Sequence, residues 1–253
     1  MKPIVLRTNV TPLVAFLSLI QSRLDPEASL EGKRILDCGG GGRVPPIALF
    51  AEQGMATWAL DISAGGLAKA HAFAAERELS IELVHGDMRE MPFENAFFDY
   101  VYEIYSMCHL TKADTQRAID EMHRVLRPGG FAFLGVISTD SWPKLFFGEE
   151  ATPGEFVGEE FDGERARHSM FTETEADDLV SRWEILSKEK RIRYLLDSAE
   201  DLSEEAWMEL RESARPRVTE AAWRADYSKR HNACLYAHVH FILRKPGSRR
   251  MGA

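Results

Sequence analysis

The sequence has few cysteines, no excess of basic residues and no long apolar run, and each absence excludes a class of protein. Its three cysteines (Cys38, Cys108 and Cys234) form no Cys-x-x-Cys pair, so no zinc motif is present, and this usage fits a reducing cytoplasm. Acidic residues outnumber basic ones by 40 to 31, and the net charge of −9 disfavours a nucleic-acid partner, whose phosphates require a basic surface. No apolar run is long enough to cross a bilayer, so we expect a cytoplasmic protein without a membrane partner.

The N-terminal segment is the one place where a targeting signal has to be considered. Apolar residues recur at helical spacing over 11–24, Thr11 can cap a helix there, and Pro12 can open it. No small-residue cleavage site follows. We therefore expect an amphipathic helix that packs on the domain. Its apolar positions are Leu13, Phe16, Leu17, Ile20 and Leu24.

A glycine-rich loop organises the rest of the chain. A short apolar run ends in Asp37, glycines occupy 39–42, and prolines at 45–46 open an apolar segment, a pattern that predicts strand, tight loop and helix. Such a loop is typical of a nucleotide-type cofactor site. The dinucleotide fingerprint is not met, because Val44 or Pro45 falls at its last position, and no Lys-Ser/Thr follows as in a P-loop. Asp37 would place a carboxylate at the strand end, aimed at a cation.

A second acid follows the next predicted strand, 57–60. Asp61 stands roughly 20 residues past the glycines, where a carboxylate can bind both hydroxyls of a ribose. The alternative is that Asp61 only caps the following helix, but Ser63 is the better cap. We therefore expect Asp61 to bind the ribose of a cofactor.

Three segments together resemble the class I S-adenosylmethionine-dependent methyltransferases. The run 37–42 (Asp-Cys-Gly-Gly-Gly-Gly) is similar to the family's motif I, with Arg43 where its third glycine usually stands. Arg43 either reaches the methionine carboxylate of the cofactor or points to solvent. The segment 85–93 (His-Gly-Asp-Met-Arg-Glu-Met-Pro-Phe) resembles the family's adenine-binding stretch. The run 121–130 (Glu-Met-His-Arg-Val-Leu-Arg-Pro-Gly-Gly) resembles a helix–turn–strand motif of the family that has a structural role.

The resemblance implies an α/β fold over the single domain 1–253. We expect a Rossmann-like, doubly wound, seven-stranded sheet with an antiparallel last strand, helices on both faces, an N-terminal helix and a helical insertion. The N-terminal helix either covers the cofactor or only buries an edge of the sheet. The stretch from 138 to 167 has no clear period and several large aromatics, so we interpret it as a long lid or binding loop. The segments 138–171 and 198–232 are expected on the substrate side.

The resemblance also implies a cofactor, S-adenosylmethionine, and a set of residues that bind it. Asp87 would accept a hydrogen bond from the adenine amine, and Met88 would pack on the ring or, alternatively, only fill the core. Glu103 is a candidate partner of the methionine ammonium. The full expected set is Asp37, Gly39, Gly41, Asp61, Ile62, Asp87, Met88 and Glu103.

Tyr105 and His109 follow the predicted fourth strand and are the candidate catalytic residues, although a lone histidine there is more often structural. His168 could contact substrate or anchor the lid. His238 and His240 share a strand face, but no third ligand has suitable spacing, so no metal is expected.

The predicted activity is methyl transfer to a small molecule by positioning, without a strong catalytic base. The family's Asn-Pro-Pro-Tyr motif of nucleic-acid methylases is absent. The rivals are a non-catalytic S-adenosylmethionine-binding module and an NAD(P)-dependent oxidoreductase. We expect a monomer or homodimer.

Overall fold

The computed structural model describes residues 11–23, 29–141, 147–159, 165–194, 219–221 and 235–247, together with 205 and 208. Most of the predicted insertion over 198–232 therefore lies outside the described residues. None of the helices in the described part of the chain is both long and apolar enough to span a bilayer.

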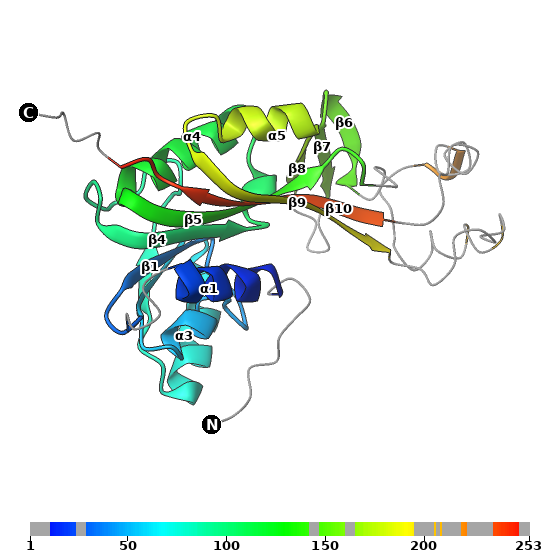
Figure 1. Cartoon of the computed structure of the whole chain (residues 1–253). Helices are drawn as coiled ribbons and strands as arrows, with labels where there is room; N and C mark the ends of the chain where they lie inside the picture. Colours follow the sequence, from blue (N-terminus) through cyan, green and yellow to red (C-terminus); the bar gives the residue numbers. More distant parts are fainter. Residues whose placement is uncertain are drawn as a thin grey trace, which may run out of the picture.

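A central sheet runs through the molecule (Figure 1). Its parallel strands are β1 (Arg34–Cys38), β2 (Ala56–Asp61), β3 (Glu82–His85), β4 (Phe98–Ile104) and β5 (Leu126–Ser138). They lie in the order β3-β2-β1-β4-β5. Next to β5 lies β10 (Leu235–Arg244), which is antiparallel to β5 and to β9 (Glu184–Tyr194). The path β3-β2-β1-β4-β5-β10-β9 thus has the predicted antiparallel last strand.

Three further strands overturn two expectations, the irregular loop over 138–167 and the seven-stranded sheet, because the sheet has ten strands in the described residues. They are β6 (Glu149–Thr152), β7 (Glu155–Glu159) and β8 (Arg165–Phe171). They pair antiparallel with one another, and β8 joins the carboxyl end of β5 in parallel. The sequence pattern missed them because these strands are short and interrupted by charged residues, and Phe156 is the one core residue described in β7.

Helices cover both faces of the sheet, as predicted for a doubly wound fold. Their bounds are α1 (Thr11–Arg23), α2 (Ala48–Ala51), α3 (Ala64–Arg77), α4 (Lys112–Val125) and α5 (Glu173–Leu179), with a 3₁₀ turn η1 (Met107–His109). In Figure 1, α1 lies on one side of the sheet, and α4 and α5 lie on the other. The predicted helix over 45–53 is only four residues long, because the amides of Ala48, Leu49 and Phe50 bond to carbonyls three residues back, as in 3₁₀ turns.

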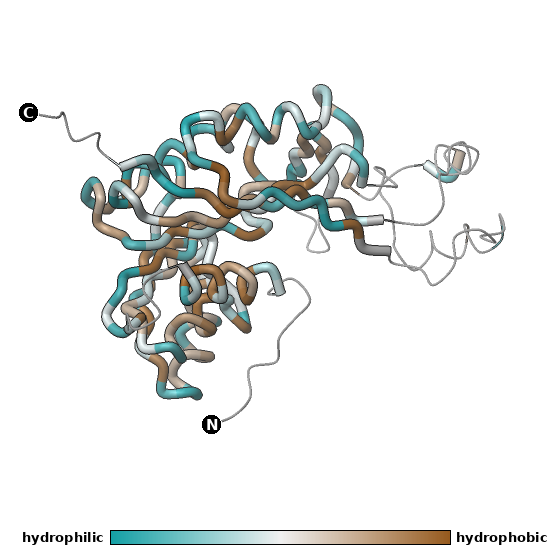
Figure 2. Tube along the Cα trace, in the orientation of Figure 1, coloured by the Kyte–Doolittle hydropathy of each residue, from teal (hydrophilic) through white to brown (hydrophobic). Residues whose placement is uncertain are grey.

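Two apolar clusters fill the layers above and below the sheet. Alternate residues of β1 point to opposite faces, so Leu36 packs with α4 and α5 while Ile35 packs with α1 and α2. Figure 2 shows the apolar stretches concentrated along the central strands and α1. Four of the predicted apolar positions of α1 are buried, and Phe16 contacts Phe50 and Phe133. The N-terminal helix therefore packs on the sheet.

Candidate active site

A cavity of about 570 Å³ opens at the carboxyl ends of the parallel strands. This is the edge where open α/β sheets bind ligands, and the volume lies within the usual range for small-molecule sites. No residue of α1 lines it. The lining residues are Gly39, Leu60, Asp61, Ile62, Gly86, Asp87, Met88, Arg89, Tyr105, Ser106, His109, Leu110, Thr111, Asp114 and Arg167.

Most of the residues expected to bind the cofactor line this cavity. Gly39, Asp61, Ile62, Asp87 and Met88 contribute from the ends of β1, β2 and β3. The candidate catalytic residues also line it, from the segment after β4. Three expected residues do not reach the wall: Asp37, Gly41 and Glu103.

The glycine loop is closely packed against the segment that follows β4. Gly39 has a φ of +98°, and a Cβ there would lie 2.2 Å from the hydroxyl oxygen of Ser106. That hydroxyl donates a hydrogen bond to the Gly39 carbonyl at 3.3 Å. Both the backbone angle and the contact require glycine at this position. Arg43 is exposed and lies outside the cavity lining.

Asp61 connects the glycine loop to the start of α3. Its Oδ2 accepts a hydrogen bond from the Gly41 amide at 2.8 Å, and its Oδ1 accepts one from the Ser63 amide at 2.7 Å. Ser63 is the N-cap of α3, as the sequence predicted, and its hydroxyl accepts from the Gly66 amide. Gly41 itself does not line the cavity. Because it has no side chain, its backbone can approach the carboxylate of Asp61, which does line the cavity.

Asp37 lies beneath the loop and is buried. The Tyr102 hydroxyl donates to its Oδ2 at 2.6 Å. Burial raises the pKa of Asp37 to about 7, and the bond from Tyr102 lowers it in part. Asp37 is therefore a buried carboxyl at the base of the site, and its pKa lies near neutral pH.

Glu103 is the second buried carboxyl and holds the turn after β4. Its Oε1 accepts hydrogen bonds from the amides of Ser106 and Met107. Burial raises the pKa of Glu103 to about 8, although these two bonds lower it in part. Its direct neighbours are thus backbone groups, which it arranges so that Tyr105 and Ser106 face the cavity.

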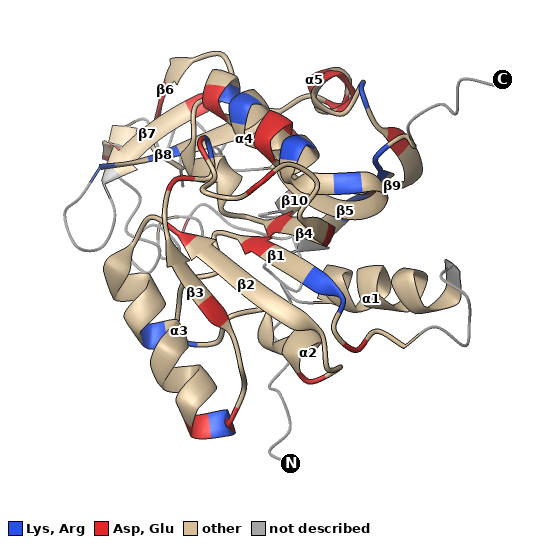
Figure 3. Cartoon of the chain, turned by 90° about the vertical axis from the view of Figure 1, so that its left-hand side faces the viewer, with Lys and Arg blue, Asp and Glu red and all other residues tan. Residues whose placement is uncertain are grey.

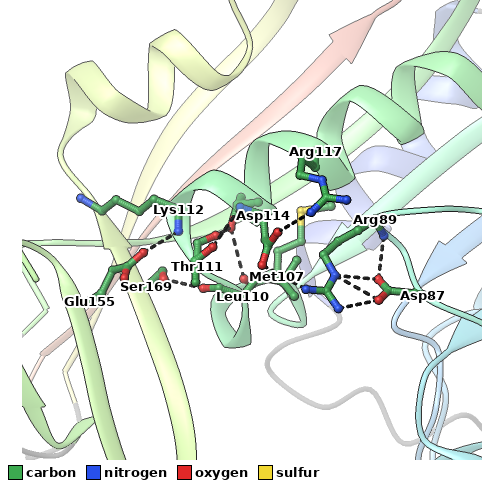
Figure 4. A network of polar contacts seen from close by, with 11 residues as sticks. Asp87, Arg89, Met107, Leu110, Thr111, Lys112, Asp114, Arg117, Glu155 and Ser169 are labelled. Atoms are coloured by element: carbon green, nitrogen blue, oxygen red, sulfur yellow. Dashed lines mark hydrogen bonds and ion pairs between the residues drawn. The ribbon is translucent and has the colours of Figure 1, made fainter. Parts of the chain in front are cut away.

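A network of charged groups forms another part of the wall (Figure 4). Arg89 binds both carboxylate oxygens of Asp87, with Nη2 and Oδ2 2.6 Å apart, and also contacts Asp114 Oδ2 at 3.0 Å. These bonds hold the pKa of Asp87 below its ordinary value. Each carboxylate oxygen has more than one lone pair, so Asp87 can still accept a further hydrogen bond. Figure 3 shows that both charge signs alternate along α4, which carries Asp114.

Sequence reasoning did not identify Arg89, Asp114 or Arg167 as wall residues. The only signal for Arg89 was its position two residues after Asp87. Asp114 and Arg167 reach the cavity from α4 and β8, and no local pattern links those segments to the glycine loop.

The candidate catalytic residues are each fixed by a group from a distant segment. Tyr105 has a φ of +66°, and its hydroxyl lies 2.9 Å from Nε2 of His240 on β10. His109 Nδ1 lies 3.1 Å from the carbonyl oxygen of Arg167, so Nδ1 donates that bond. The ring of His168 packs on His109 with centroids 4.9 Å apart, but His168 does not line the cavity.

The described residues contain no group of three or more His, Cys, Asp or Glu side chains placed to hold a metal ion. His238 and His240 do share a strand face, with ring centroids 5.9 Å apart.

The wall fits S-adenosylmethionine by the chemistry of its groups. Ile62 is 66% exposed at the cavity, which is unusual for isoleucine and offers a flat apolar surface to an adenine ring. Met88 supplies a second apolar group, and Asp61 supplies a carboxylate for ribose hydroxyls. At Gly39 the bare backbone leaves no side chain between loop and cavity.

Residues 36–134 match a protein family described as a methyltransferase domain. This range holds every wall residue except Arg167. The chain is also similar to sterol 24-C-methyltransferase of Saccharomyces cerevisiae, with 36% identity over 116 residues. The alignment covers 44% of this chain and 29% of the yeast protein, so the chain spans less than a third of that relative's length.

Solved structures show the same fold. A methyltransferase from Methanosarcina mazei, described as S-adenosylmethionine-dependent, superposes with a TM-score of 0.64 at 19% identity, covering 91% of this chain and 98% of that one. The 1,6-didemethyltoxoflavin N1-methyltransferase of Burkholderia thailandensis, solved with its substrate and S-adenosylhomocysteine, has a TM-score of 0.56 at 17% identity. It covers 94% of this chain and 79% of that one. The predicted α/β, Rossmann-like fold class is confirmed.

Proposed function

We propose that this chain is a class I S-adenosylmethionine-dependent methyltransferase, with S-adenosylmethionine as its cofactor, and that it transfers a methyl group to a small-molecule acceptor. The observation that carries the proposal is the cavity at the carboxyl edge of the sheet. It brings a bare glycine backbone, a strand-end carboxylate and an exposed isoleucine onto one wall, at Gly39, Asp61 and Ile62. The yeast relative is named for a sterol, and the structural neighbour from Burkholderia thailandensis is named for 1,6-didemethyltoxoflavin, which supports a small acceptor here.

The cofactor-binding roles follow from the position of each side chain. Asp61 binds the ribose hydroxyls, and Asp87 accepts from the adenine amine. Ile62 and Met88 pack on the adenine ring. Asp37, Gly41 and Glu103 act through the groups that they hold, because none of them reaches the wall. Asp37 and Glu103 also place potential negative charge beneath the cofactor's ammonium group.

Catalysis relies on positioning more than on a strong base. The bound cofactor supplies a methyl group on a sulfonium sulfur that leaves as a neutral thioether. The protein must align the acceptor with that methyl group and exclude water. Since His109 donates from Nδ1 to the Arg167 carbonyl, its neutral ring has the lone pair on Nε2. His109 can therefore receive the proton that an acceptor loses.

The cofactor assignment is tested by a thermal-shift titration with S-adenosylhomocysteine beside NADH. At about 100 times its dissociation constant, a ligand should add roughly 2.7 kcal/mol to the free energy of unfolding. Stabilisation by S-adenosylhomocysteine alone is the expected result. Stabilisation by NADH alone would replace the proposal with the oxidoreductase alternative.

Binding and turnover share the same cofactor residues, so a second test separates the enzyme from a non-catalytic binding module. The protein is incubated with S-adenosylmethionine carrying a labelled methyl group and a panel of small acceptors. Transfer of label to an acceptor, with release of S-adenosylhomocysteine, is expected. Cofactor binding without transfer to any acceptor class would favour the binding module.

A further inference from the structure

The side chain of Tyr105 connects the cavity to the last strand of the sheet. Tyr105 lines the cavity, and its hydroxyl contacts His240 Nε2 at 2.9 Å across a sequence separation of 135 residues. Its positive φ of +66° is rare for a residue with a bulky side chain and costs energy, so the surrounding structure must hold it there. This arrangement places the phenol on the wall of the cavity.

The sheet is built to admit this contact. His240 pairs with Gly135 on β5 and with Glu189 on β9. A Cβ at Gly135 would lie 3.2 Å from His240 Cδ2 and 3.5 Å from Tyr105 Cε1, so a side chain there would crowd both rings. Glycine in the middle of a buried strand weakens packing, and here it leaves room for the two rings to meet.

The hydrogen bond has a defined direction. The side chain of His240 is only 2% exposed, and burial lowers its pKa to about 4, so the ring is neutral near pH 7. Its Nδ1 makes no hydrogen bond among the described residues but lies 3.5 Å from Oε1 of Glu189, and this negative charge favours the tautomer with the proton on Nδ1. His240 Nε2 then carries a lone pair, and Tyr105 is the donor. Because the phenol proton points to His240, the phenol oxygen can offer only a lone pair to another group.

A chain of rings runs behind the cavity and connects its two wall residues that carry rings, Tyr105 and His109. The Tyr105 and His238 ring centroids are 4.3 Å apart, and His238 stacks on Tyr236 at 5.7 Å with an angle of 19°. Phe147 packs on Tyr236 at 5.4 Å and on His168 at 5.2 Å. The line of rings ends at His109, which again lines the cavity. The cavity wall thus has a ring at each end of this chain, and stacking on such rings favours a flat ring as the bound group.

We propose that Tyr105 determines acceptor specificity by accepting a hydrogen bond from a hydroxyl group on a flat apolar ring, and that His240 is the positioning residue that turns the phenol proton away. The O–H of the acceptor is then the group that the cavity wall recognises, and an acceptor of equal shape without an O–H is rejected. This inference rests on the proposed function, because it concerns the second substrate of the same cavity.

The test compares two ligands of nearly the same shape. The protein is saturated with S-adenosylhomocysteine, and 2-naphthol and its methyl ether, 2-methoxynaphthalene, are titrated in ligand-observed NMR. 2-Naphthol should bind roughly five to ten times more tightly, the size expected for one hydrogen bond. Tyr105→Phe should bring this ratio close to one.

Two further variants separate hydrogen bonding from a loss of structure. Tyr100→Phe makes the same change on β4, the strand that leads to Tyr105, but Tyr100 lies outside the cavity lining, so the ratio should stay at the wild-type value. His240→Phe keeps a ring in place but removes the acceptor of the Tyr105 proton. The phenol can then donate into the cavity, and the ratio should shift toward the methyl ether.

The inference is overturned if the wild-type protein binds neither naphthalene, if it binds both equally, or if Tyr105→Phe retains the preference. Calorimetry with S-adenosylhomocysteine is run on every variant. If the wild-type protein does not bind S-adenosylhomocysteine, the proposed function itself is refuted. Normal binding without discrimination between the two naphthalenes would refute only the role of Tyr105.

Discussion

At the scale of single residues, Asp61 is the side chain whose two tasks can be separated by experiment. It lines the cavity and also holds the amides of Gly41 and Ser63. Asp61→Ala should weaken binding of S-adenosylhomocysteine by roughly 1.5–3 kcal/mol, the cost of losing charge-assisted hydrogen bonds. Isothermal titration calorimetry measures this loss.

Ser63→Ala is the control for this prediction. It removes the cap of α3 and should lower the free energy of unfolding by about 1 kcal/mol, while the affinity for the cofactor is retained. Unchanged affinity in Asp61→Ala would assign Asp61 a purely structural role.

Asp37 provides a pH test of the buried carboxyl beneath the glycine loop. Burial raises its folded-state pKa from 3.8 to about 7. Between these values the unfolded chain ionises Asp37 while the folded protein keeps it protonated, so stability falls as pH rises from about 4 to about 7. The slope should be on the order of 1 kcal/mol per pH unit for this group. Asp37→Asn should flatten the curve of unfolding free energy against pH, measured by urea denaturation. The same slope in variant and wild type would contradict the assigned burial.

Single residues were predictable from the sequence where a local motif places them. Gly39, Asp61 and Asp87 each follow a parallel strand, and such strand ends meet at one edge of the sheet. The partners of Tyr105 and Arg89 were not predictable. His240 reaches Tyr105 only through the register of β10 on β5, and register across distant strands leaves no trace in a local pattern.

At the scale of elements, the parallel strands were predictable and the β6–β8 unit was not. The core strands are nearly continuous apolar runs because both faces are buried, and such runs stand out in sequence. In β7 the buried Phe156 is flanked by Glu155 and Val157, and the strand is too short to show a period of two. What fixes β7 is a tertiary contact: Glu155 accepts a hydrogen bond from the Lys112 amide at 2.6 Å and pairs with Arg167 at 2.8 Å.

The two contacts of Glu155, with the Lys112 amide and with Arg167, should anchor the β6–β8 unit to α4. Glu155→Gln keeps the shape of the side chain but removes the charge that Arg167 and the first turn of α4 face. Because Glu155 is only 12% exposed, the variant should lose roughly 1–2 kcal/mol of unfolding free energy in urea denaturation. Glu149→Gln, at an exposed position on β6, should change stability by less than about 0.5 kcal/mol. Equal effects of the two changes would mean that Glu155 does not anchor the unit.

At the scale of the whole molecule, the two apolar clusters share one sheet, which links the stability of its two faces. Ile35 and Leu36 are neighbours on β1 but belong to different clusters, so neither face can lose its packing without disturbing the same strand. The described core should therefore unfold as one cooperative unit. The cavity lies at the edge of this shared sheet, and a ligand bound there should stabilise both faces together.

Hydrogen exchange measured with and without S-adenosylhomocysteine tests this linkage. At about 100 times its dissociation constant the ligand should raise the opening free energy of slowly exchanging amides in β1, β4, β5 and β10 by about the same amount, roughly 2.7 kcal/mol. Amides of β10 are the informative ones. They lie beyond β5, and the links to the cavity wall described for them are the sheet itself and the contacts of His238 and His240 with Tyr105. If β1 and β4 gain protection while β10 does not, the last strand opens independently. The sheet would then consist of two cooperative units that meet at β5.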